Sequence, residues 1–250
     1  MVDTHAHLAI CEPDDAELVA SALESGVGRI LTVGMDEESN AAAVAAADAH
    51  DAVLACVGRH PNSAAGFDAA AADRIAELAR LPSVAAVGET GLDYFRDSAP
   101  HDDQRRAFDA QIEIARDAGK PVVIHMRESV DDTFEVLRAH ADGVAVILHC
   151  FSAPAECVAE EVERGWYCSF AGNLTYPRSD DLRDAARLVA DELLLVETDS
   201  PFLSPQPQRG KPNQPANVVA TAARLAELRE REYADLEALV ERNAAGVLGW

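Results

Sequence analysis

Residues 119–149 read GKPVVIHMRESVDDTFEVLRAHADGVAVILH, and this stretch decides the fold. Two apolar runs within it, Val122–Ile124 and Val144–Leu148, are continuous and do not alternate with polar residues. Such runs are typical of strands in a parallel sheet that is buried on both faces. The segment between them, Asp131–Ala139, has the amphipathic pattern of a helix, and Gly143 follows its end. The stretch therefore predicts one strand–helix–strand unit whose two strands are parallel.

The same alternation extends in both directions over the whole chain. Short β-branched runs predict eight strands, at Val2–His5, Arg29–Val33, Val53–Val57, Val84–Gly88, Val122–His125, Val144–His149, Trp166–Phe170 and Leu193–Glu197. Segments rich in alanine, leucine and acids predict the helices between them, at Asp14–Glu24, Glu37–Ala49, Asp68–Ala79, Asp102–Ala118, Asp131–Ala139, Ala155–Glu163 and Asp180–Ala190. A long loop at Pro201–Pro215 and two more helices, near Ala216–Arg229 and Tyr233–Ala245, complete the chain.

Strict alternation of eight strands with helices predicts an α/β fold, a closed (β/α)8 TIM barrel. We expect residues 1–250 to form a single domain, because the sequence shows no internal repeat and no low-complexity tail. An open doubly wound sheet is the alternative. It is disfavoured because no G-x-G-x-x-G motif follows the first predicted strand.

The chain is strongly acidic, with 44 acidic residues against 21 basic ones and a net charge of −23. Only Lys120 and Lys211 are lysines. An acidic, lysine-poor surface keeps a protein soluble where salt screens self-repulsion, so we expect a halophilic protein. The alternative is an ordinary acidic cytoplasmic protein. The composition lacks the basic excess of a nucleic-acid-binding face, so any phosphate contact must be local.

Composition also excludes several classes of protein. A hydrophobic fraction of 48% and a charged fraction of 26% are those of a globular chain and not of a disordered one. No apolar run is long enough to span a bilayer and no signal peptide precedes the first strand, so we expect a cytoplasmic protein without membrane contact. The five cysteines are odd in number and form no C-x-x-C, which predicts free thiols.

Several histidines and acids share one position relative to the predicted strands. The histidines at or just past the carboxyl end of a strand are His5, His7, His60, His125 and His149. The carboxylates placed in the same way are Asp3, Glu89 and Asp199. Because this end of the sheet carries the active site in (β/α)8 barrels, we expect these side chains to converge on one mouth.

His5 and His7 are the sharpest local feature. Positions i and i+2 of a strand point to the same side, so both imidazoles can reach one cation. The whole candidate ligand set is His5, His7, Glu89, His125, His149 and Asp199. Such ligands suit Zn2+, Mn2+ or Mg2+, and six of them exceed the need of one ion, which predicts two divalent metal ions bridged by Glu89. The alternative is a hydrogen-bonded polar rim without metal, which would bury many charges at high cost.

The motifs of the chain resemble those of the TatD family of metal-dependent deoxyribonucleases, within the amidohydrolase-like barrels. In chain order they are Asp3–Leu8 (DTHAHL), Gly58–Pro61 (GRHP), Gly88–Tyr94 (GETGLDY), His125–Arg127 (HMR), His149–Ser152 (HCFS) and Glu197–Leu203 (ETDSPFL). The resemblance continues through Arg209–Lys211 and Asn213–Asn217, so it covers essentially the whole chain. Two positions depart from the family pattern: Asn62 replaces a frequent histidine, and Gln214 replaces a common glutamate.

The resemblance implies a role for each member of the candidate site. One metal would be held by His5, His7, Glu89 and Asp199, and the second by Glu89, His125 and His149. His60 matches the phosphate-contacting histidine of the family, and Glu197 and Arg127 lie where site residues are expected. The implied activity is metal-dependent hydrolysis of DNA, including 3′→5′ exonuclease action on single-stranded DNA.

The expected mechanism gives catalytic roles to Asp199, Glu89 and Glu197. A water activated by the cations attacks phosphorus in line, and Asp199 accepts its proton. Glu197 either contacts the reacting groups or orients a ligand histidine.

Four side chains are expected to bind substrate, namely His60, Arg127, Arg209 and Lys211. The first three would hold phosphate oxygens, and Lys211 would meet the nucleic-acid backbone from the long loop. The plainer alternatives are a bond to the backbone for His60, a salt bridge to Glu128 or another acid for Arg127, and an exposed solvated loop for Lys211. Tyr94 and Phe95 either stack on a base or pack against the rim.

Other functions stay open at this point. A metal-dependent amidohydrolase acting on a C–N bond or a lactone of a small molecule would show the same barrel, although Glu89 excludes a carbamylated bridging lysine at its position. RNA or aminoacyl-tRNA could replace DNA as the ester substrate. A non-catalytic scaffold is disfavoured by the intact ligand set. The sequence indicates neither the native metal nor the oligomeric state.

Overall fold

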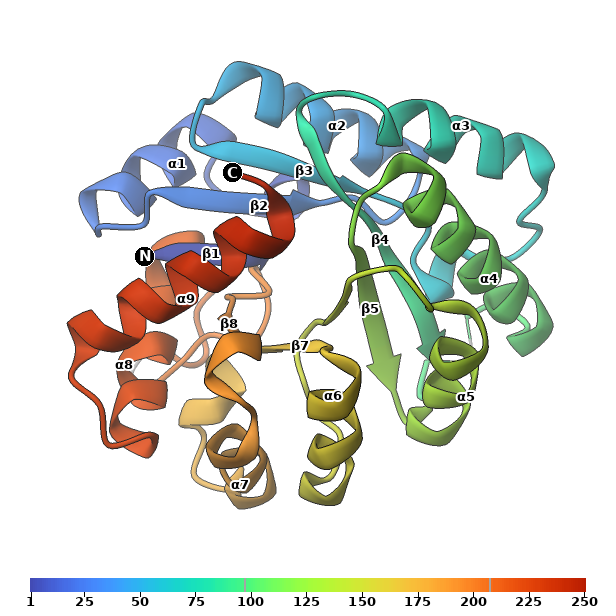
Figure 1. Cartoon of the computed structure of the whole chain (residues 1–250). Helices are drawn as coiled ribbons and strands as arrows, with labels where there is room; N and C mark the ends of the chain where they lie inside the picture. Colours follow the sequence, from blue (N-terminus) through green and yellow to red (C-terminus); the bar gives the residue numbers. More distant parts are fainter. Residues whose placement is uncertain (97, 207) are drawn as a thin grey trace.

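The computed structural model contains eight parallel strands that lie side by side in chain order (Figure 1). The structure describes residues 1–96, 98–206 and 208–250. The strands are β1 Val2–Ala6, β2 Arg29–Val33, β3 Val53–Val57, β4 Val84–Asp93, β5 Val122–Arg127, β6 Val146–Leu148, β7 Tyr167–Phe170 and β8 Leu194–Val196. Each strand pairs in parallel with the next. The predicted (β/α)8 barrel is confirmed.

Helices surround the sheet and connect its strands (Figure 1). They are α1 Asp15–Glu24, α2 Glu37–Ala49, α3 Ala69–Ala79, α4 His101–Ala118, α5 Val130–His140, α6 Val158–Arg164, α7 Asp180–Leu188, α8 Val218–Leu228 and α9 Tyr233–Leu248. The side chains of Asp14, Asp36 and Asp68 accept backbone N–H groups in the first turns of α1, α2 and α3, which fixes where these helices begin. No helix in the described ranges is long and apolar enough to cross a membrane.

Some element boundaries differ from the predicted ones for identifiable reasons. The segment Ala155–Cys157, predicted as α-helix, is a 3-10 turn that precedes α6. Strand β6 begins at Val146 and not at Val144, because the N–H of Val144 bonds to Ala141 in the turn after α5. In the loop predicted after β8, Pro207 lies outside the described residues.

Helix α7 also ends earlier than predicted, at Leu188 instead of Ala190. The guanidinium of Arg229 donates to the carbonyl oxygens of Ala186 (3.0 Å) and Val189 (2.7 Å). A side chain thus satisfies carbonyl groups that a longer helix would have used, and the helix stops there.

Strand β4 is longer than predicted and runs on from Gly88 to Asp93. Its pairing with β5 shifts between Val87 and Thr90 and then continues from Gly91 opposite His125 to Asp93 opposite Arg127. Gly91 has φ of +136°, and a Cβ there would lie 2.1 Å from the carbonyl oxygen of His125. Only glycine permits this close approach of the two strands.

The barrel closes where β1 meets the chain just after β8. A single parallel bridge joins Ala6 to Ser200. The N–H of Asp199 donates to the carbonyl of His5 (2.9 Å), and the N–H of His7 donates to the carbonyl of Ser200 (2.8 Å). We call this junction the closing seam.

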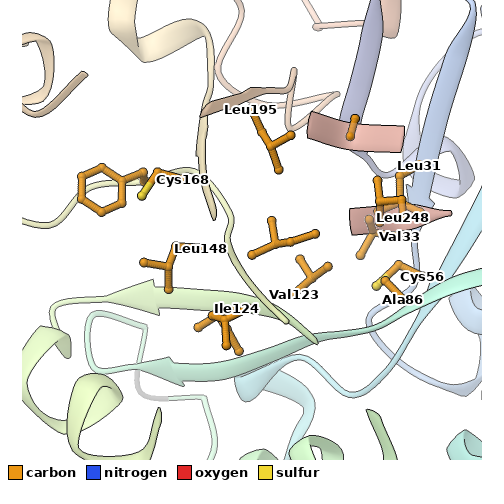
Figure 2. Packing of buried hydrophobic residues seen from close by; sticks show 14 of the residues in the cluster. Leu31, Val33, Cys56, Ala86, Val123, Ile124, Leu148, Cys168, Leu195 and Leu248 are labelled. Atoms are coloured by element: carbon orange, nitrogen blue, oxygen red, sulfur yellow. The ribbon is translucent and has the colours of Figure 1, made fainter. Parts of the chain in front are cut away.

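Apolar side chains from the strands fill the interior. Figure 2 shows buried residues from β2 to β8 and from α9, among them Leu31, Cys56, Val123, Leu148 and Leu248. Of the continuous apolar runs predicted to be buried on both faces, Val122–Ile124 in β5 and Val146–Leu148 in β6 are buried as expected, whereas Val144 is half-buried and Ala145 is exposed. The five cysteines are free thiols, which confirms that prediction.

A buried carboxyl group lies away from the carboxyl ends of the strands, between α6 and β7. Glu161 is fully buried, and its Oε2 accepts a hydrogen bond from Sγ of Cys168 (3.4 Å). Its Oε1 has no hydrogen-bond partner among the described residues. Burial raises the pKa of Glu161 from 4.5 to about 7.

The carboxyl group of Glu161 should make the free energy of unfolding depend on pH. As pH rises from about 4.5 towards 7, the unfolded chain releases the proton of Glu161 while the folded chain retains it, so stability falls. We expect Glu161 to cost about 2 kcal/mol of unfolding free energy between about pH 5 and 8. Denaturant titrations at several pH values measure the unfolding free energy. In Glu161→Gln its fall between about pH 5 and 8 should be smaller than in the wild type by the contribution of Glu161. In Glu163→Gln, which changes an exposed position on the same helix, the fall should be as in the wild type. An equal loss in wild type and Glu161→Gln would exclude this role.

Candidate metal centre and active site

The carboxyl ends of the strands bring together the side chains expected to bind metal. They are His5 on β1, His7 after it, Glu89 on β4, His125 on β5, His149 after β6 and Asp199 after β8. His5 and Glu89 are at most 1% exposed, and His149 is 6% exposed. The structure therefore places all six residues at one end of the barrel, in contact with one another.

Glu89 lies at the centre of this group. Five imidazole nitrogens approach its carboxylate: at Oε2 those of His5 (3.4 Å) and His7 (3.6 Å), and at Oε1 those of His125 (2.6 Å), His149 (3.1 Å) and His60 (3.6 Å). Burial alone would raise its pKa, but His149 and His60 hold the pKa of Glu89 well below its usual value. Each carboxylate oxygen thus faces a different set of histidines, as a ligand shared between two ions would.

The first set consists of His5, His7 and Asp199. Nδ1 of His7 lies 2.9 Å from the carbonyl oxygen of Val33 and donates to it, so in the neutral imidazole Nε2 carries a lone pair. That Nε2 faces Asp199 Oδ1 at 3.5 Å and His5 Nε2 at 3.3 Å. Lone pairs that point at one another need a proton or a cation between them.

The second set consists of Glu89, His125 and His149. Nδ1 of His149 lies 2.9 Å from Glu197 Oε1, which also accepts the N–H of Cys150 at 2.9 Å. In the neutral ring the proton is therefore on Nδ1, so Nε2, 3.1 Å from Glu89 Oε1, would offer its lone pair to a cation bound between the two residues. Burial opposes protonation, but Glu197 and Glu89 raise the pKa of His149 well above its usual value. Glu197 thus lies behind His149 and orients it.

His60 differs from these histidines in its tautomer. Its Nδ1 accepts the backbone N–H of Asn62 at 3.0 Å, so the proton of the neutral ring is on Nε2. That Nε2–H is directed towards the site, 3.6 Å from Glu89 Oε1. Burial lowers the pKa of His60 to about 3, which keeps the ring neutral. His60 presents a hydrogen-bond donor where His7 and His149 present lone pairs.

The donor set fits divalent cations. Three groups have ligand atoms within 4.8 Å of one another: His5, His7 and Asp199; His5, His149 and Glu197; and His60, Glu89 and His125. In addition, Nδ1 of His5 and Oε2 of Glu197 are buried and have no hydrogen-bond partner among the described residues. Buried imidazole and carboxylate donors without a hydrogen-bond partner are typical of sites for Zn2+ or Mn2+.

Asp93 belongs to the site although the sequence motifs alone gave it no role. Its Oδ2 lies 3.1 Å from Nε2 of His125 and accepts a hydrogen bond from Nδ2 of Asn62 at 3.0 Å. Asp93 therefore holds the ring of His125 from the side opposite Glu89. The available signal was its place in the GETGLDY motif, where only Glu89 received a role.

Asp3, at the start of the DTHAHL motif, supports the closing seam from within. It is fully buried, and it accepts the backbone N–H (2.8 Å) and the hydroxyl (2.6 Å) of Thr198. Burial raises the pKa of Asp3 to about 8. Asp3 thus fixes the residue that precedes Asp199, although it is not itself in a candidate ligand group.

The basic residues expected to bind substrate are exposed, Arg127 at the end of β5 and Arg209 and Lys211 on the loop after β8. The guanidinium of Arg127 lies 3.9 Å from the ring centroid of Phe95, and that of Arg209 lies 4.1 Å from the ring centroid of Tyr176. Within the described ranges neither arginine forms an ion pair with a carboxylate, so the salt bridge considered for Arg127 is not seen among these residues. Lys211 is also exposed. These cations are available to an incoming anion.

The two neighbouring aromatic residues after β4 separate in the structure. The hydroxyl of Tyr94 donates to Asp132 Oδ2 (2.6 Å), and its ring stacks on His101 with centroids 4.0 Å apart. Phe95, in contrast, is 56% exposed. Tyr94 packs against the rim, and only Phe95 is presented to solvent.

The chain is similar to known proteins over its whole length. The family model described as TatD related DNase matches residues 2–249. The chain is 39% identical to an uncharacterized metal-dependent hydrolase, TatD, of Mycobacterium tuberculosis, over 100% of this chain and 99% of that protein. It is 32% identical to the 3′-5′ ssDNA/RNA exonuclease TatD of Escherichia coli, over 94% of this chain and 93% of that protein.

A solved structure shows the same arrangement of the chain. The crystal structure of YjjV, a TatD homolog from Escherichia coli, has a TM-score of 0.93 to this chain at 27% identity. The match covers 100% of this chain and 98% of that one. The barrel and its strand order are therefore shared with that homolog over the full length.

Proposed function

This chain belongs to the TatD-related DNase family of metal-dependent hydrolases, and we propose that it is a two-metal phosphodiesterase that degrades single-stranded DNA from the 3′ end. The observation that carries the proposal is the central position of Glu89. Its Oε1 and Oε2 face different histidines, which suits one carboxylate bridging two ions. The Escherichia coli relative, named as an exonuclease on ssDNA and RNA, supports the choice of substrate.

We assign one ion to His5, His7, Glu89 and Asp199, and the other to Glu89, His125 and His149. When bound, divalent cations at such ligands make a water molecule more acidic and stabilise negative charge on phosphoryl oxygens. Mg2+, Mn2+ and Zn2+ all fit this set of donors. Glu197 and Asp93 keep the rings of His149 and His125 turned towards Glu89.

The remaining side chains bind the phosphate and move the proton. Asp199 is 14% exposed at its side chain, so it can accept the proton of an attacking water. The Nε2–H of His60 and the guanidinium groups of Arg127 and Arg209 donate to phosphate oxygens, and Lys211 contacts the backbone further along the strand.

The reaction is a hydrolysis in which one P–O bond replaces another. The water oxygen bonds to phosphorus and the P–O3′ bond breaks. The water proton passes to Asp199, and the departing O3′ takes a proton from solvent. The products are a nucleoside 5′-monophosphate and a strand shortened by one residue with a free 3′-hydroxyl.

A labelled-strand assay tests this function. We expect a 5′-labelled single strand to shorten progressively and a 3′-labelled strand to release its label as a mononucleotide at once. Chelator should stop both, and added Mg2+ or Mn2+ should restore them. RNA, aminoacyl esters, amides and lactones form the comparison panel. Faster turnover of any of these, or cleavage that persists in chelator, would overturn the assignment.

The salt concentration and the compartment in which the protein works are also matters for proposals. We propose that the protein works in high salt, because its net charge is −23 and it has two lysines, and that it is cytoplasmic, because its five cysteines are free. The assay should therefore be run from low to molar salt. Activity that is greatest at low salt would contradict the proposal that the protein works in high salt.

A further inference from the structure

Two exposed aromatic rings lie on the loops that surround the candidate metal centre. The exposed large apolar side chains of the described residues are Ile10, Leu23, Phe95, Val162, Leu188 and Phe202. Only Phe95 and Phe202 among these are aromatic, with exposed fractions of 56% and 48%. Single exposed apolar side chains are ordinary on a protein surface, but these two are aromatic and both lie beside the candidate metal centre, which makes them candidate contacts for a substrate.

The two rings lie on opposite sides of the barrel mouth. Phe95 follows β4 and lies under the guanidinium of Arg127, the last residue of β5. Phe202 follows β8, and its ring centroid is 6.2 Å from that of His7, just after β1. Because the strands run in order from β1 to β8 around the barrel, the β4–β5 pair is opposite the β8–β1 junction. The metal ligands lie between the two rings.

Both rings are carried by backbone that is fixed to the site. The N–H of Phe95 donates to Oδ1 of Asp93 (3.0 Å), the residue that also holds His125. The N–H of Phe202 donates to the carbonyl of Asp199 (2.8 Å), and its own carbonyl accepts from Nδ2 of Asn213 (2.7 Å). Asn213 is 1% exposed. The backbone of each aromatic residue is therefore tied by a hydrogen bond to a residue of the candidate site.

We propose that Phe95 and Phe202 are base-stacking positions for the two nucleotides that flank the scissile phosphate. This inference rests on the proposed function. It means that the site recognises the unpaired base as well as the phosphate. Every nucleobase has an aromatic face, so such stacking tolerates any sequence. A base inside a duplex is already stacked on its neighbours and cannot reach both rings.

The charge of the protein strengthens this inference. A chain of net charge −23 repels a polyanion, and salt that screens this repulsion also weakens the contacts of Arg127 with phosphate. Stacking on a ring involves no counterion release, so it keeps its strength in salt. Two exposed phenylalanines thus supply strand binding that the sparse basic residues of this rim cannot supply.

Strands with and without bases provide the test. The substrate pair is a 5′-labelled single strand and the same strand with abasic residues at its two 3′-terminal positions, which keeps every phosphate. For the wild type we expect kcat/KM to be about tenfold or more higher on the normal strand, at low and at molar salt alike. In Phe202→Ala and Phe95→Ala the ratio should fall towards one, mostly through KM, and Phe202→Trp should restore it.

Controls separate this inference from the function on which it rests. Leu188→Ala, at an exposed apolar position on α7, should leave the ratio as in the wild type. Equal cleavage of both strands by the wild type, or an unchanged ratio in Phe202→Ala and Phe95→Ala, would overturn the stacking role and leave the phosphodiesterase proposal intact. Failure of the wild type to cleave either strand would instead remove the proposed function, and the stacking role with it.

Discussion

Replacement of Glu89 by glutamine is expected to lower kcat/KM for single-stranded DNA at least about a thousandfold while the barrel stays folded. The change keeps the size of the side chain and removes its charge. A neutral amide binds divalent cations poorly, and its NH2 group would meet imidazole nitrogens where an oxygen now lies. Both candidate ions lose a shared ligand at once, which is why we expect this effect to be the largest of any single substitution.

The measurement pairs single-strand hydrolysis with metal content and thermal unfolding. Glu89→Gln should bind fewer divalent ions after desalting and should lose the rise in Tm that added Mn2+ gives the wild type. Glu128→Gln, an exposed carboxylate on the same rim, is the matched control and should keep both properties. Activity within tenfold of the wild type in a Glu89→Gln protein free of contaminating wild type would exclude a bridging role.

Substitution of His149 and His60 by alanine should separate a metal ligand from a phosphate contact. Glu197 holds the proton of His149 on Nδ1, so Nε2 can give its lone pair to a cation, whereas Nδ1 of His60 accepts the N–H of Asn62 and leaves a proton on Nε2. His149→Ala should therefore bind one ion fewer per chain and lose about a hundredfold or more in kcat. His60→Ala should keep the wild-type number of ions and still lose about a hundredfold in turnover.

Metal analysis and titration calorimetry with Mn2+ decide between these two behaviours. His140→Ala, at an exposed histidine in the last turn of α5, serves as the control for loss of an imidazole elsewhere. The assignment of His60 fails if His60→Ala loses an ion, since the group of His60, Glu89 and His125 would then be the real second site. The assignment of His149 fails if its removal leaves metal content unchanged.

The barrel and the place of its mouth could be predicted from the sequence because both depend on local pattern. Apolar runs such as Val122–Ile124 mark strands buried on both faces, and polar residues directly after them mark one end of the sheet. Strand ends were less predictable. Val144 belongs by composition to β6, but its N–H bonds to Ala141, and only the three-dimensional turn decides this.

The finer parts of the site depend on contacts between residues far apart in the chain. Glu197 could have touched the reacting groups, and its actual place behind His149 follows from how β6 and β8 face each other. Tyr94 and Phe95 look equivalent in the sequence, but Asp132 and His101 bind Tyr94 and leave Phe95 exposed. The position of the proton on each histidine ring also depends on such partners. Spacing in the sequence therefore does not distinguish a histidine that binds metal from one that donates a hydrogen bond.

The closing seam has a consequence for how the protein is made. His5 and His7 lie on one side of it and Asp199 on the other, so the first ligand set exists only after the ring of strands has shut. During synthesis β1 leaves the ribosome before β8, so His5 and His7 are present before Asp199. We therefore expect metal to bind at these residues late in maturation, and we expect a cation bound across the seam to stabilise the closed barrel.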